Sequence, residues 1–146
     1  MIGMLILAIS AGAFALSFNI WTITPKREAE RLFAKLSSLM LKADRTQTHF
    51  KIEVDSDKIR IQWNSEYTDL VNKRYVFIED FPASKGVYYL WNPDYSSDAK
   101  NKSVCYSYIT NRYNNGATIT VNGKDTLYYV IIATVGSRVR ISDTHP

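Results

Sequence analysis

The chain has 146 residues, of which 46% are hydrophobic, 22% charged and 13% aromatic, a composition that excludes an intrinsically disordered protein. The net charge of +4 at pH 7 is small and spread along the chain, so by itself it identifies no anionic partner. The single cysteine, Cys105, excludes an internal disulfide, and its apolar surroundings predict a small buried side chain rather than a reactive thiol.

Residues 1–24 contain no charged side chain. A helix of about 20 apolar residues spans a hydrocarbon layer of about 30 Å, and Trp21 suits the interface with water. We expect a transmembrane and assembly helix here. A cleaved signal peptide is the less favoured alternative, because no Lys or Arg precedes the apolar run and no small-residue cleavage site ends it. A buried core helix is a further alternative.

An amphipathic helix is predicted over residues 25–45. Its apolar side chains recur at steps of three and four, which places them on one stripe that we expect to pack on a sheet. The stripe consists of Leu32, Phe33, Leu36, Leu39 and Met40, with Ala29 and Ala43 beside them. Thr24 suits an N-cap and Pro25 the first helical position; in an unbroken helix Pro25 would instead cause a kink. We expect the charged side chains off the stripe, Glu28 among them, to be solvated.

Strands are predicted from residue 48 onward, where the period of the apolar residues changes to two. Residues 50–54 and 59–63 form a hairpin around Asp55-Ser56-Asp57, with one apolar face and one polar face that contains His49. Further strands are expected at 74–79, 87–91, 103–109 and 137–142. A second hairpin joins 117–121 to 126–135 through Asn122-Gly123, the strongest short turn signal.

No motif of enzymatic chemistry is present. The chain has no nucleophile elbow, no glycine-rich phosphate loop and no zinc-binding helix motif, and its two histidines, His49 and His145, are far apart in sequence. We therefore expect no catalytic residues, no cofactor, no metal and no small-molecule substrate. The oxygen-rich loop between Asp94 and Asp98 is the better of two weak candidates for calcium, although it lacks the spacing of a calcium-binding loop.

Nucleic-acid binding is an alternative that the basic residues of the C-terminal third leave open. Binding to phosphates needs clustered cations, and stacking on bases needs exposed aromatic rings. Tyr113, Tyr128 and Tyr129 lie near the candidate cations in sequence, but scattered strand cations are more often simply solvated. The candidates are Arg112, Lys124, Arg138 and Arg140.

Several segments together resemble the pilin superfamily. They are the apolar leading segment, the run Arg27-Glu28-Ala29-Glu30-Arg31-Leu32, the alternating hairpin, and the closing stretches 115–121, 129–135 and 136–141 with Gly136-Ser137-Arg138-Val139-Arg140. Within the superfamily the chain is most similar to the H-type (GspH/FimT-like) minor pseudopilins. It lacks that family's prepilin cleavage motif and the glutamate inside the apolar run.

The resemblance implies an α+β, pilin-like fold: a long N-terminal helix, apolar in its first half, packed on an antiparallel β-sheet domain of residues 46–146. It implies a non-enzymatic subunit of a type II secretion or type IV pilus-like filament, held in the bacterial inner membrane by a single pass with a periplasmic globular domain. Its partners would be the membrane and other pilin-like subunits. The implied assembly residues are Leu5, Leu7, Phe14, Leu16 and Phe18. Alternatives are a competence-type minor pilin that binds DNA and a membrane-anchored extracytoplasmic binding domain.

Overall fold

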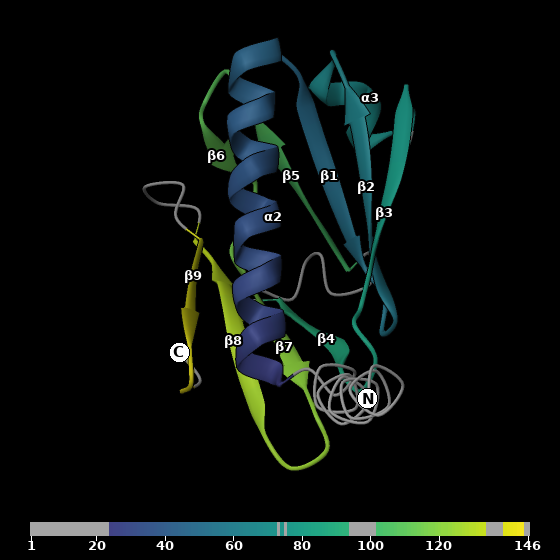
Figure 1. Cartoon of the computed structure of the whole chain (residues 1–146). Coiled ribbons are helices and arrows are strands. Elements are labelled where there is room, and N and C mark those ends of the chain that lie inside the picture. The colour runs from purple at the N-terminus through teal and green to yellow at the C-terminus, as the bar shows by residue number, and fades with distance from the viewer. Residues whose placement is uncertain (1–23, 73, 75, 94–101, 134–138, 145–146) are drawn as a thin grey trace, which may run out of the picture.

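The computed structural model describes residues 24–72, 74, 76–93, 102–133 and 139–144. These residues form helix α2 (Pro25–Thr46), the short helix α3 (Tyr67–Val71) and antiparallel strands (Figure 1). The strands are β1 (His49–Val54), β2 (Lys58–Asn64), β3 (Phe77–Pro82), β4 (Tyr88–Pro93), β5 (Ser103–Ser107), β6 (Arg112–Tyr113), β7 (Ala117–Asn122), β8 (Leu127–Ile132) and β9 (Val139–Ser142).

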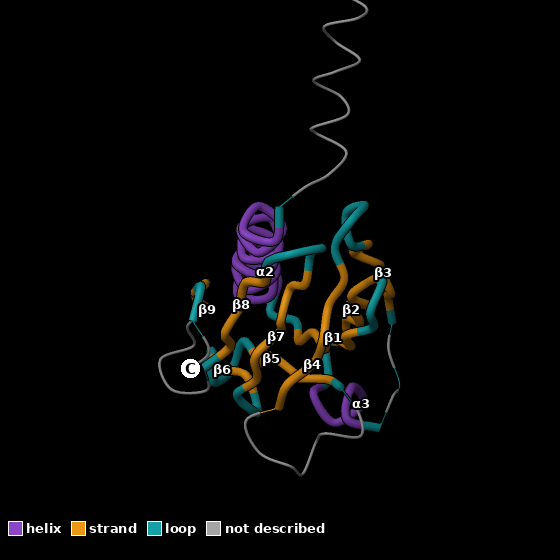
Figure 2. The backbone as a smooth tube through the Cα atoms, turned by 90° about the horizontal axis from the view of Figure 1, so that it is seen from below, coloured by secondary structure: helices purple, strands orange, loops and turns teal. Residues whose placement is uncertain are grey.

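The strands form two sheets. Sheet A has the order β3-β2-β1-β5-β6, and sheet B has the order β4-β7-β8-β9. The predicted first hairpin is confirmed as β1 and β2, in which Phe50 lies opposite Trp63 and Val54 opposite Ile59. Figure 2 shows α2 and α3 on opposite sides of the strands. The two helices therefore cover different faces of sheet A.

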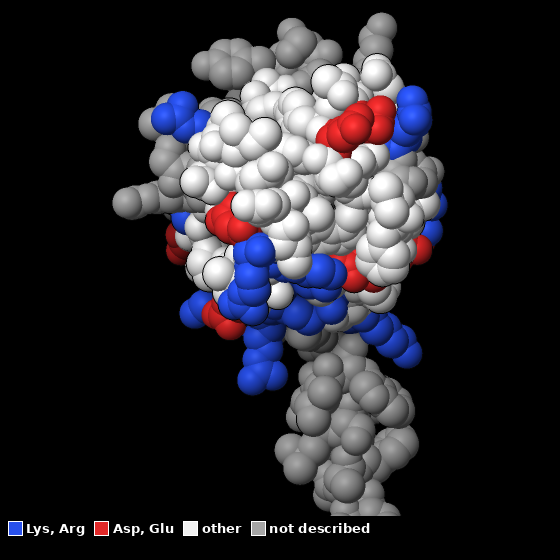
Figure 3. All heavy atoms as spheres, turned by 90° about the horizontal axis from the view of Figure 1, so that it is seen from above, with Lys and Arg blue, Asp and Glu red and all other residues white. Residues whose placement is uncertain are grey.

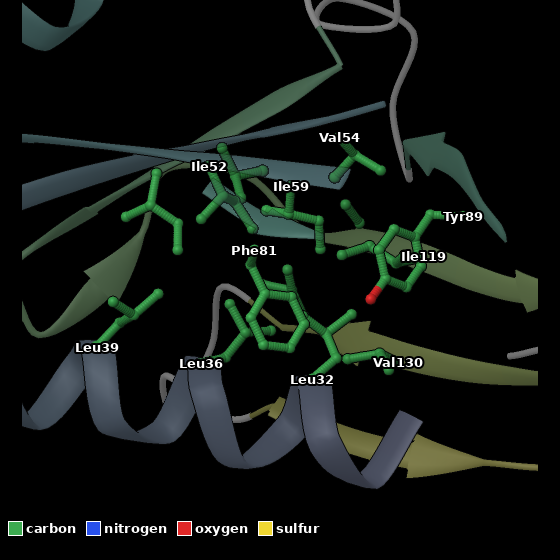
Figure 4. Packing of buried hydrophobic residues seen from close by; sticks show 14 of the residues in the cluster. Leu32, Leu36, Leu39, Ile52, Val54, Ile59, Phe81, Tyr89, Ile119 and Val130 are labelled. Carbon is green, nitrogen blue, oxygen red and sulfur yellow. The ribbon is translucent and has the colours of Figure 1, made fainter. Parts of the chain in front are cut away.

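Helix α2 begins and ends at residues suited to those positions. The side chain of Thr24 accepts a hydrogen bond from the backbone N–H of Arg27, and Gln47 ends the helix in a left-handed conformation with φ 53°. Leu32, Leu36 and Leu39 are buried, and the helix contacts β1 of sheet A and β7, β8 and β9 of sheet B. Figure 4 shows these leucines pointing into a core that both sheets line.

The prediction of a long N-terminal helix packed on one antiparallel sheet is wrong. The backbone of Thr24 is extended (φ −76°, ψ 153°), so the described helix starts at Pro25 and spans only 22 residues. Antiparallel strands are the commonest structure in the described chain, and they form two sheets because β4 pairs with β7 instead of β3 and β5 returns to β1. Alternation of apolar residues identifies a strand, but it does not select the partner of that strand.

The predicted membrane anchor also needs correction. Among the residues that the structure describes, no helix is long and apolar enough to cross a membrane. Helix α2 itself carries charged side chains from its first turn to its last, which hydrocarbon does not tolerate. Residues 1–23, where the sequence predicts the anchor, lie outside the described residues. The transmembrane helix and the single-pass inner-membrane localisation are therefore not supported.

The polar face of the first hairpin is partly buried, at His49, Lys51 and Gln62, although the sequence predicts that it is solvated. Leu70 of α3 is buried, and the backbone carbonyl of Leu70 accepts a hydrogen bond from Lys51 Nζ at 3.4 Å. Lys51 is 5% exposed and His49 is 2% exposed, with the His49 ring 5.5 Å from that of Tyr67 and 4.9 Å from that of Tyr108. Cys105, opposite Lys51 in the sheet, is buried as predicted. Sheet A thus has a second, partly polar interior.

The turn between β7 and β8 confirms the second predicted hairpin but gives its glycine another role. Gly123 donates to the carbonyl of Thr126 at 2.9 Å, and the described glycine with positive φ is Gly86 instead. A Cβ atom on Gly123 would lie 2.7 Å from Cγ of Pro25. Position 123 therefore requires glycine because Pro25, in the first turn of α2, leaves no room for a Cβ atom. A left-handed backbone is not the reason.

Replacing Gly123 by alanine is expected to lower the free energy of unfolding by about 1–3 kcal/mol, the usual range for an overpacked site. The matched control is Lys124→Ala in the same turn, where the side chain is exposed and a change within about 0.5 kcal/mol is expected. Urea unfolding followed by circular dichroism measures both. Equal stabilities of the two variants would contradict the close contact with Pro25.

The stability of the fold is expected to fall when His49 becomes protonated. Burial lowers the pKa of His49, and its Nδ1 has no hydrogen-bond partner among the described residues. The unfolded chain therefore takes up this proton at higher pH than the folded chain does. Stability is unaffected above about pH 6.5 and decreases below it, by at most about 1.4 kcal/mol per pH unit for one group.

The variant His49→Phe keeps an aromatic ring in this site and should reduce the loss of stability between about pH 6.5 and 5. Urea unfolding at several pH values measures the slope. The matched control is His145→Phe, which should keep the slope of the unsubstituted protein. If His49→Phe and the unsubstituted protein lose stability in parallel, His49 is not the titrating group.

Candidate functional site

The residues predicted to mediate assembly and packing fall into two groups. Leu5, Leu7, Phe14, Leu16 and Phe18 lie outside the described residues. The helix stripe is within them: Leu32, Leu36 and Leu39 are buried, Met40 is half-buried and Phe33 is exposed. Three of the five stripe residues therefore line the core, and Phe33 lies at its edge.

A partly buried ion pair, which the sequence did not predict, holds the first turns of α2. Glu28 is fully buried and forms a two-point salt bridge with Arg31, whose Nη2 lies 3.2 Å from Glu28 Oε2. The same carboxylate accepts from the backbone N–H of Ser84 at 2.6 Å and from its hydroxyl at 3.3 Å. Arg31 also donates to the carbonyl of Pro82. We refer to Glu28, Arg31, Pro82 and Ser84 as the Glu28 cluster.

The charges of this cluster act on each other and on Tyr89. Burial lowers the pKa of Arg31, but the hydrogen bond and charge of Glu28 outweigh this effect and the net pKa is raised. Burial, followed by the negative charge of Glu28, raises the pKa of Tyr89 far above its ordinary value. These shifts favour a charged Arg31 and a neutral Tyr89 in the folded protein. The polar residue Glu28 is buried because Ser84, distant in sequence, supplies its hydrogen bonds.

One flank of α2 is basic. The positions of its cations, at steps of three, four and seven, place them on the same side of the helix. They are Arg27, Arg31, Lys35, Lys42 and Arg45. Figure 3 shows Lys and Arg side chains gathered at the lower edge of that view, where α2 lies. The Arg31 guanidinium lies 4.0 Å from the centre of the Phe81 ring, and Lys35 Nζ lies 3.6 Å from Glu79 Oε1, so this flank faces β3.

A groove of about 370 Å³ lies beside the C-terminal half of this flank. Its walls include Lys42 and Thr46 of α2, Trp63 of β2, and Val76 and Phe77 at the start of β3. The Nζ atom of Lys42 is 4.8 Å from the centre of the Trp63 ring and 5.9 Å from that of Phe77. Val76 is 81% exposed and Phe77 51% exposed. The result is an uncovered apolar surface with a cation at its margin.

The structure does not assemble the cations proposed for DNA binding. Arg112 lies on β6 and Lys124 in the turn between β7 and β8, at opposite ends of the molecule (Figure 1). Arg140 lies on β9, and Arg138 lies outside the described residues. All three described side chains are exposed, but they form no common patch. The basic flank of α2 is the denser group of cations in the described chain.

The described residues contain no group of three or more His, Cys, Asp or Glu side chains that could hold a metal ion. The candidate calcium loop, Asp94 to Asp98, lies outside them. No family model, curated protein or solved structure matches the chain. The comparisons thus give no support to an assignment of this chain to the pseudopilins or to a secretion system. The family resemblance stays a prediction from the sequence.

Replacing Glu28 by alanine is expected to lower the free energy of unfolding by about 2–3 kcal/mol, because Arg31 and the N–H of Ser84 both lose their partner. The matched control is Glu30→Ala, an exposed acidic residue on the same helix that should change stability by less than about 0.5 kcal/mol. Chemical unfolding of both variants gives the comparison. A Glu28→Ala protein as stable as Glu30→Ala would show that the cluster contributes nothing.

Proposed function

We propose that this chain is a non-enzymatic structural subunit of a pilus-like filament, similar to a minor pseudopilin, and that it assembles through its apolar leading segment. The proposal rests on the family resemblance and on one feature of the structure. The point at which residues 1–23 join the folded domain is held in place by a helix cap and by contacts with two segments distant in sequence.

These contacts all lie within the first two turns of α2. Thr24 caps the helix, Pro25 packs against Gly123 in the turn between β7 and β8, and Glu28 accepts two hydrogen bonds from Ser84 between β3 and β4. Both sheets therefore hold the first turns of the helix. A subunit whose contacts are made by its leading segment needs such a junction, because the junction sets the orientation of the domain relative to its neighbours.

The driving force for assembly is the burial of apolar surface between subunits. Residues 1–23 contain no charge. An exposed apolar segment of that length is unfavourable in water unless other molecules, here neighbouring subunits, shield it. Burial contributes about 25 cal/mol per Å², so several large side chains are enough to stabilise a contact between subunits. Of the side chains in this segment, Phe14 is the largest near its middle and is the one to test.

The variant Phe14→Asp is expected to abolish co-purification of two differently tagged copies expressed together, because a carboxylate in an apolar interface costs several kcal/mol. The matched control is Leu41→Asp, an exposed position on α2 that should leave co-purification unchanged. Copies that never co-purify, or that do so equally with Asp at position 14, would contradict the proposal. Circular dichroism of both variants verifies that the domain is folded.

A further inference from the structure

We propose that the groove beside the C-terminal half of α2 binds an acidic segment of a partner protein, with a large apolar side chain of that segment in the groove and its carboxylates on Lys42 and Arg45. The groove lies at the opposite end of α2 from the Glu28 cluster. The proposal therefore goes beyond the filament function and does not depend on it.

The apolar part of the groove has the size of a small binding site. Its volume of about 370 Å³ is near the lower end of the range for ligand pockets, about 300–1,000 Å³, and is suited to one or two side chains. Val76 and Phe77 form one margin and are largely exposed. Covering them by an apolar side chain removes this surface from water, which is favourable at about 25 cal/mol per Å².

The charge at the margin of the groove selects an acidic occupant. Two other cations on the flank are already paired, Arg31 with Glu28 and Lys35 with Glu79. Lys42 and Arg45 are exposed and form no salt bridge within the part of the chain that the structure describes. Contact with the Trp63 ring restricts the position of Lys42, so less side-chain entropy is lost when a carboxylate binds.

A protein segment fits this surface better than a nucleic acid does. Single strands bind by stacking bases on exposed rings and by neutralising many phosphates. Of the rings that line the groove, Trp63 is only 5% exposed and Phe77 is 51% exposed, and Lys42 is the cation among the lining residues. The exposed aliphatic side chain of Val76 offers nothing to a phosphate backbone, but it is suited to the apolar side chains of a protein.

The test uses the full chain labelled with ¹⁵N and a short synthetic peptide that alternates glutamate and leucine. Titration with the peptide should shift the indole N–H signal of Trp63, assigned with the variant Trp63→Phe, in a saturable manner. The double variant Lys42→Glu/Arg45→Glu should weaken binding by about tenfold or more, as expected when two attractive contacts become repulsive. Val76→Ser should weaken it as well.

Matched controls separate this site from general charge effects. Arg112→Glu and Lys124→Glu change exposed cations elsewhere, and they should leave the affinity for the peptide nearly unchanged. Lys42→Met keeps the packing on Trp63 without the charge, so it should weaken binding while the unfolding midpoint is unchanged. A peptide of alternating lysine and leucine should not shift the Trp63 signal.

Three results would overturn the proposal. The first is no shift of the Trp63 signal at any concentration of the glutamate–leucine peptide. The second is an affinity that survives the Lys42→Glu/Arg45→Glu change. The third is tighter binding of an oligothymidylate strand with the same dependence on Lys42 and Val76, which would make this a nucleic-acid surface.

Discussion

One buried carboxylate joins helix α2 to the segment where the chain passes from one sheet to the other. Glu28 binds the backbone of Ser84, in the connection where the chain leaves β3 of sheet A and enters β4 of sheet B. A carboxylate with no access to water is unfavourable unless it is paired and hydrogen-bonded, and Arg31 and Ser84 together meet both conditions. The same contact holds the start of α2 against the connection between the sheets, and the core contacts of Leu32, Leu36 and Leu39 hold the rest of the helix.

Helix α2 contributes to the core of both sheets, and this explains how its two ends acquire different roles. Leu32 and Leu36 lie in the interior that the sheets share, and near the C-terminal end Asp44 accepts hydrogen bonds from the hydroxyl of Tyr106 on β5 at 3.0 and 3.2 Å. The N-terminal end is held firmly where residues 1–23 join it, which suits a subunit contact. The C-terminal end lies beside an uncovered groove, which suits recognition of a separate partner.

Local patterns predicted the elements whose causes are local. The helix over residues 25–45 and the hairpin around Asp55-Ser56-Asp57 follow from the periods of their apolar residues, and both are confirmed. The two-sheet arrangement, helix α3 and the burial of His49 were not predicted, because each depends on which distant segment covers which face. For the same reason Glu28 was expected to be solvated: its partner, Ser84, is far away in sequence. The groove unites Lys42, Trp63 and Val76, and no spacing in the sequence reveals that.

The contacts of α2 also determine when its apolar stripe is covered during synthesis. The helix packs on β8 and β9, the last two described strands, whereas the helix itself precedes every described strand in the chain. The stripe of α2 therefore stays without these partners until β8 and β9 have been translated. Native contacts between segments so distant in sequence slow folding in general, and an apolar helix face that waits for them is a surface that chaperones for apolar segments recognise.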